Sequence, residues 1–149
     1  MTNLRSFVLV FGLIVAAYLC YEFLRETERD RVEAVTYSLA EAAEAGDTAT
    51  LLASIDASAA EMRAETERII NRYKPDEVTI TKCFVEVDSD SDPPTAIADV
   101  IVRTRGMVDG TMPGSSLVGG TIEYVKRGET WLVTNFEFRR LFQNGLVRP

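Results

Sequence analysis

The residue types best suited to binding a metal are three aspartates at alternate positions, Asp88, Asp90 and Asp92. Their spacing matches the start of a calcium-binding loop, which also needs a glycine at its sixth position and a bidentate glutamate at its twelfth. Those two positions hold Pro93 and Asp99 instead. We therefore interpret the triplet as a solvated turn between strands, and we expect no bound metal.

The remaining residues offer little support for catalysis. The chain has no histidine, which is the commonest general base and the commonest metal ligand. Its two cysteines, Cys20 and Cys83, fall in a predicted helix and a predicted strand and are not expected to meet. We expect neither a cofactor nor enzymatic activity.

The length and charge of the chain limit the classes of partner. Its 149 residues allow one domain of ordinary size, and its net charge is −7. An acidic domain repels phosphate groups, so we expect no binding to nucleic acid.

The C-terminal part of the chain is rich in aromatic residues and arginine. Trp131 lies close to Phe136, Phe138 and Phe142, which suits the core of a final strand, with a ligand pocket as the alternative. Residues 139–149 contain three arginines, several apolar residues and no acid. This tail is either a frayed end or a docking segment. The candidate docking residues are Arg139, Arg140, Leu141, Phe142, Leu146 and Arg148.

Residues 7–24 form the longest apolar run, about 18 residues, and they predict a membrane-spanning helix. A cleaved signal peptide ending near Ala17 is the alternative. We expect the rest of the chain on the exported side of a cell membrane, periplasmic or extracellular. Arg25, Arg29 and Arg31 argue for the opposite orientation by the positive-inside rule.

Helical periodicity continues beyond this run. No glycine or proline occurs between Gly12 and Gly46, so we expect the anchor and the first domain helix to form one continuous rod. Gly46 is predicted to end this rod and Asp47 to begin a short helix. A capping box at residues 58–61 predicts a third helix, which Pro75 ends.

From residue 77 the apolar periodicity changes to that of strands. Alternating β-branched residues predict strands at 78–87, 95–105, 117–126 and 131–138. The glycines and the proline of residues 106–116 predict a loop, and Arg127, Gly128 and Glu129 predict a tight hairpin turn.

Helices followed by antiparallel strands predict an α+β domain. A helix ending in Glu44-Ala45-Gly46-Asp47, and the closing pair of strands with Trp131-Leu132-Val133 after its turn, resemble the nuclear-transport-factor-two-like superfamily. The resemblance implies a cone of three helices packed on a curved, mainly antiparallel four-stranded sheet of the cystatin-like kind. We divide the chain into an anchor (1–25), this domain (26–142) and a tail (143–149).

Enzymes of the resembled superfamily carry an acid, a base or a tyrosine inside the cone. The resemblance therefore makes Asp99 a candidate for proton abstraction, and five further residues candidates to line a cavity: Tyr37, Tyr73, Tyr124, Trp131 and Asn135. Pairing of Asp99 with Arg103 or Arg105 on an exposed surface is the simpler interpretation.

Three functions remain open from the sequence. The first is a non-catalytic, membrane-anchored accessory or scaffold subunit of a membrane protein assembly, with lipid around residues 7–24 and a protein partner. The second is a module that binds a small apolar ligand in the cone. The third is an isomerase-like enzyme with a buried aspartate and tyrosine.

Overall fold

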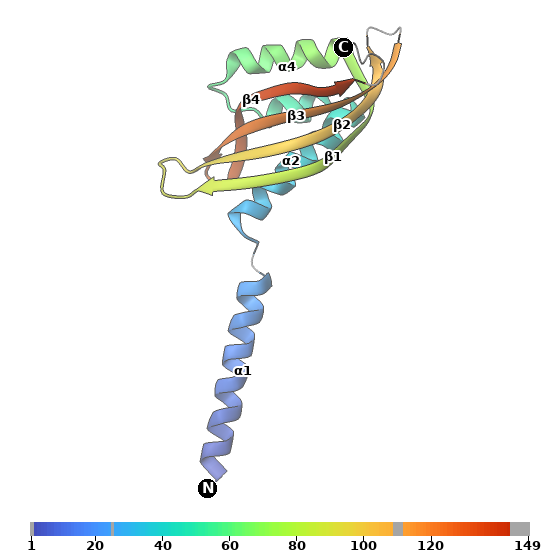
Figure 1. Cartoon of the computed structure of the whole chain (residues 1–149). Helices are drawn as coiled ribbons and strands as arrows, with labels where there is room; N and C mark the ends of the chain where they lie inside the picture. The colour runs from blue at the N-terminus through green and yellow to red at the C-terminus, as the bar shows by residue number, and fades with distance from the viewer. Residues whose placement is uncertain (1, 25, 109–111, 144–149) are drawn as a thin grey trace.

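The computed structural model describes residues 2–24, 26–108 and 112–143. It contains helix α1 (Thr2–Leu24) and three further helices, α2 (Glu28–Ala45), α3 (Thr48–Ala53) and α4 (Ala60–Arg72). Four strands follow, β1 (Tyr73–Asp88), β2 (Thr95–Val108), β3 (Met112–Arg127) and β4 (Thr130–Gln143). In Figure 1, α1 extends away from the folded unit that α2 to β4 form.

The strands form one curved antiparallel sheet in the order β1-β2-β3-β4 (Figure 1). Each strand pairs with the next along the chain, and Gly128 supplies the positive φ of the turn between β3 and β4. The prediction of an α+β fold with four antiparallel strands is confirmed.

The core lies between the sheet and helices α2 and α3. Alternate residues of each strand point toward the helices, as the two-residue period of a strand requires. Ala96, Ala98 and Val100 of β2 are buried in this way, whereas Ile97 and Asp99 between them are exposed. The buried cluster comprises Val32, Ile55, Val85, Ala96, Ala98, Val100, Ile122, Tyr124, Trp131 and Val133.

The prediction of a membrane anchor at residues 7–24 is contradicted. Among the residues that the structure describes, no helix is long and apolar enough to cross a membrane. This finding contradicts the transmembrane helix in the predicted fold class. It also contradicts the predicted single-pass location in a cell membrane.

The prediction of one continuous rod is also wrong, because the chain leaves the helical conformation at Glu26 and Thr27 before α2 begins. Thr27 and Asp30 form a capping box. The Thr27 side chain accepts a bond from the Asp30 backbone N–H, and the Asp30 carboxylate accepts one from the Thr27 N–H. Satisfying these two otherwise unpaired donors favours a new helix start over continuation of the first helix.

Two other helix boundaries can be compared with the sequence. Gly46 adopts the left-handed conformation that ends α2, and the Asp47 side chain caps α3, as predicted. The predicted capping box at residues 58–61 is wrong. The hydroxyl of Ser58 donates to Asp56 instead, and α4 begins at Ala60 without a side-chain cap.

Most of the predicted loop at residues 106–116 is strand. β2 continues to Val108, β3 begins at Met112, and Gly106 pairs with Gly114 across the hairpin. Gly106 is needed for close packing rather than for a turn. A Cβ there would lie 2.6 Å from the carbonyl oxygen of Lys74 on β1.

Candidate functional site

The five predicted cavity residues do not gather around one cavity. Tyr124 and Trp131 are both buried in the core, but Tyr37 is 42% exposed on α2. Tyr73 is half-buried at the start of β1, and Asn135 lies on β4 with its amide 3.5 Å from the Glu123 carboxylate. Of the five residues, only Tyr124 and Trp131 belong to the same buried cluster.

The Tyr124 ring occupies the helix-facing side of the sheet, where the resemblance places a cavity. Its hydroxyl lies 2.8 Å from Oγ1 of Thr36, and that Oγ1 donates to the carbonyl of Val32 at 2.8 Å. Since the single hydrogen of Thr36 is used in this way, the Tyr124 hydroxyl donates to Thr36. Burial raises the pKa of Tyr124 well above its ordinary value, so the phenol remains neutral and cannot act as a base near neutral pH.

Asp99 lies on the opposite face of the sheet, which we call the outer face. It is exposed and accepts a bond of 2.7 Å from the hydroxyl of Thr121, its neighbour on β3. Asp99 and Tyr124 thus point to opposite sides of the sheet and cannot share a substrate. The alternative pairing of Asp99 with Arg103 or Arg105 is not seen either, and Arg105 lies 3.7 Å from Glu77.

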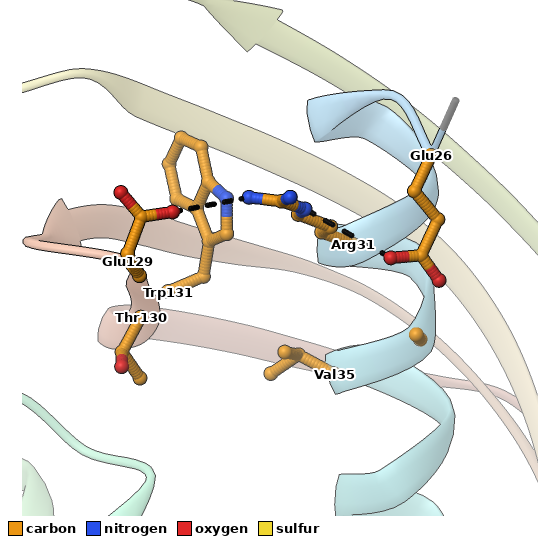
Figure 2. A pocket seen from close by; sticks show the side chains of 7 residues that line it. Glu26, Arg31, Val35, Glu129, Thr130 and Trp131 are labelled. Carbon is orange, nitrogen blue, oxygen red and sulfur yellow. Dashed lines mark hydrogen bonds and ion pairs between the residues drawn. The ribbon is translucent and has the colours of Figure 1, made fainter. Parts of the chain in front are cut away.

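One open pocket of about 420 Å³ lies where the start of α2 meets the hairpin between β3 and β4 (Figure 2). Its lining residues are Glu26, Arg31, Ala34, Val35, Glu129, Thr130 and Trp131. Figure 2 shows Arg31 reaching from α2 toward Glu129, with Glu26 on its other side. The guanidinium lies 3.3 Å from Glu28, 3.4 Å from Glu129 and 3.9 Å from Glu26, so its charge is already balanced by three carboxylates.

Glu28 joins α2 to the same hairpin beside this pocket. Its carboxylate accepts hydrogen bonds from the Trp131 indole at 2.9 Å, from the Lys126 ammonium at 3.0 Å and from Arg31 at 3.3 Å. The bond from Lys126, more than any other contact, lowers the pKa of Glu28. These bonds use the carboxylate to hold two elements together, which is a structural role.

Asp56 forms a second link, between the end of α3 and β3. The Arg127 guanidinium donates to both of its carboxylate oxygens, at 3.2 and 3.4 Å, and Ser58 donates to one of them. Arg127 first and Ser58 second lower the pKa of Asp56 to about 2. Sequence reasoning missed Glu28 and Asp56. The only available signal was that a buried tryptophan N–H needs an acceptor.

The most unusual surface is that of α1. Its apolar side chains are exposed around the helix, with Leu13 69% and Leu19 61% accessible. Soluble domains rarely leave a large contiguous apolar surface uncovered. The large apolar side chains exposed on α1 are those of Val8, Val10, Phe11, Leu13, Ile14, Val15, Tyr18, Leu19 and Tyr21.

The predicted docking tail lies partly within the sheet. Arg139 and Leu141 belong to β4 and are exposed, so they are not part of a segment beyond the last strand. Arg140 and Phe142 also lie in β4, but their side chains are outside the described part of the structure. Leu146 and Arg148 lie outside the described residues.

No family model and no curated protein matches the chain. Among solved structures, the Bdellovibrio bacteriovorus protein Bd1075 is similar, with a TM-score of 0.56 and 13% sequence identity. The match covers 79% of this chain and 45% of that protein, so this chain spans less than half its length. At this identity the likeness concerns the fold alone.

Proposed function

We propose that this protein is a non-catalytic accessory subunit that binds a partner protein through α1. The observation that carries the proposal is the exposure of apolar side chains on all sides of α1. A helix that is apolar around its whole circumference is stable when other apolar groups surround it.

The energetics favour a partner that covers several of these side chains at once. Burial of one large apolar side chain contributes roughly 1.5–3 kcal/mol. Association of two proteins costs an estimated 4–15 kcal/mol in lost freedom of motion. Coverage of one or two side chains is therefore too little, whereas a groove or helix pair that encloses α1 suffices.

The folded unit supports a scaffold role better than a ligand-binding or catalytic one. Val32, Tyr124 and Trp131 fill the space on the helix-facing side of the sheet. A protein that binds a ligand inside its cone needs that space to be open. The nuclear-transport-factor-two-like resemblance is compatible with this role, because that superfamily includes non-catalytic anchored domains.

A photo-crosslinking experiment tests the proposal on the full chain in cells that produce it. We expect a photoreactive amino acid at Leu13 or at Leu19 to form one defined adduct with a second polypeptide. The matched positions Glu61 on α4 and Lys82 on β1 are also exposed and should not give this adduct.

A charged variant supplies the second part of the test. Leu13→Glu combined with Leu19→Glu should abolish co-purification of the crosslinked partner. The melting temperature of the folded unit should not change, because neither side chain is buried there. Absence of a polypeptide adduct at both positions, or the same adduct from Glu61, would refute the proposal.

A further inference from the structure

The two edges of the sheet are protected to different degrees. On β1, the N–H of Val78 donates to the carboxylate of Glu44 on α2 at 2.9 Å. On β4, the loop after α3 forms a short parallel bridge, in which Val133 bonds Ser54 and Asp56 at 2.8 Å each. Beyond Val133, no described strand pairs with the outer side of β4.

This open edge carries few of the features that usually block strand addition. Residues 134–143 contain no proline and no lysine, and between the bulges at Thr134 and Leu141 the residues 135–140 pair regularly with β3. An exposed edge of this length presents unpaired N–H and C=O groups that another strand can bind. The uncovered edge of β4 is therefore a candidate binding site for a partner strand.

The bond pattern identifies which backbone groups point outward. The N–H and C=O of Val133 point away from β3, because they bond Asp56 and Ser54. Thr134 is an extra residue opposite β3, so the alternation shifts by one position after it. The outward groups are then those of Phe136 and Phe138.

The side chains around Phe138 are complementary to themselves. Glu137 and Arg139 are exposed on the outer face, and neither has an ion-pair partner among the residues with described side chains. Phe138 lies on the opposite face and is 47% exposed. A strand of the same sequence, turned antiparallel about Phe138, places each glutamate opposite an arginine.

We propose that β4 pairs antiparallel with β4 of a second copy of this chain, about a two-fold axis at Phe138. The backbones of the two Phe138 residues exchange hydrogen bonds, and the two aromatic rings meet on one face. Glu137 of each copy faces Arg139 of the other copy in a non-hydrogen-bonded pair, where side chains are closest. The two four-stranded sheets become one continuous sheet.

Charge selects this register over its neighbours. An axis at Glu137 places two carboxylates opposite each other, and an axis at Arg139 places two guanidinium groups opposite each other. The register at Phe138 also pairs the regular residues 136–140 of both copies, clear of the segment at Ser54 that covers Val133.

Charge reversal tests this interface in the full chain by sedimentation. We expect Glu137→Arg and Arg139→Glu each to weaken the dimer by about tenfold or more, because two attractive pairs become repulsive. The combined exchange Glu137→Arg with Arg139→Glu restores opposite charges, and its dissociation constant should return to within about threefold of the native value. Glu123→Arg, the same charge change on the outer face of β3, should have little effect.

A disulfide tests the register independently. In a Cys20→Ser background, Phe138→Cys should crosslink two copies on oxidation, because paired backbones at this position lie about 5.5 Å apart. Glu137→Cys should not, because residues 137 of the two copies are offset along the strands. Circular dichroism is the control that tests whether each variant folds.

The outcomes also separate this interface from association through α1, which every variant retains. A native chain that is monomeric in solution overturns the proposal. Equal association of the native chain, both single reversals and the exchange variant overturns it as well, and assigns any self-association to another surface.

Discussion

The indole N–H of Trp131 donates to Oε2 of Glu28 at 2.9 Å, which links the last hairpin to the first turn of α2. Trp131 is only 2% exposed, so its N–H depends on this acceptor. Lys126 and Arg31 donate to the other oxygen of the same carboxylate, so Glu28 accepts hydrogen bonds from three side chains at once.

Removal of either partner should therefore destabilise the fold. We expect Trp131→Ala to lower the free energy of unfolding by about 3–5 kcal/mol, because a large buried aromatic is lost. Glu28→Ala should lower it by about 1–3 kcal/mol, because a buried N–H loses its acceptor. Glu26→Ala, which removes an exposed carboxylate near Arg31, should change it by less than about 0.5 kcal/mol. Urea denaturation measures all three, and a larger loss for Glu26→Ala than for Glu28→Ala contradicts the prediction.

The lowered pKa of Asp56 predicts how the free energy of unfolding depends on pH. Its pKa is about 2 in the folded chain because of Arg127 and Ser58, against about 3.9 for an aspartate in an unfolded chain. The unfolded state therefore binds more protons between these values. The stabilisation from Asp56 is complete above about pH 5 and is lost as the pH falls from about 4 toward about 2.

The comparison of native protein with Asp56→Asn tests this dependence. The difference in melting temperature should be largest near pH 6 and should shrink as the pH falls below about 4. Asp90→Asn is the matched control, since Asp90 is an exposed aspartate in a turn. A difference that is constant from pH 6 to pH 2.5 would mean that the charge of Asp56 does not contribute.

The strands were the most predictable part of this fold. Period-two alternation predicted β2 as a strand but did not decide which face is buried. Asp99 was a candidate for the inside of the cone, whereas the buried residues are its neighbours Ala98 and Val100 together with Ala96. The prediction failed at Gly106, because a glycine required by the close approach of β1 has the same one-letter signal as a glycine in a turn.

The contacts between distant segments were not predictable from the sequence. The start of α2 was readable in principle, since Thr27 and Asp30 have capping-box spacing. By contrast, Glu28 meets Trp131 across 103 positions of the chain, and Asp56 meets Arg127 across 71. Such pairs depend on how the hairpin folds back over the helices, which no local pattern encodes.

The hydrogen bond between Tyr124 and Thr36 provides the last prediction, a double-mutant cycle in the core. Tyr124→Phe removes the donor but leaves Thr36 bonded to the Val32 carbonyl, so we expect a loss of about 1 kcal/mol in the free energy of unfolding. Thr36→Val leaves the buried Tyr124 hydroxyl without its acceptor, and should cost about 1–3 kcal/mol. With both substitutions, no polar group at this contact remains unpaired.

The double variant should therefore lose less stability than the two single variants combined, by about 1 kcal/mol. Tyr37→Phe, at the neighbouring exposed position of α2, is the control and should be close to neutral. Urea denaturation at neutral pH suits the cycle, because the raised pKa keeps Tyr124 protonated there. Strictly additive losses would mean that the two hydroxyls act independently, and that the bond between α2 and β3 contributes nothing to stability.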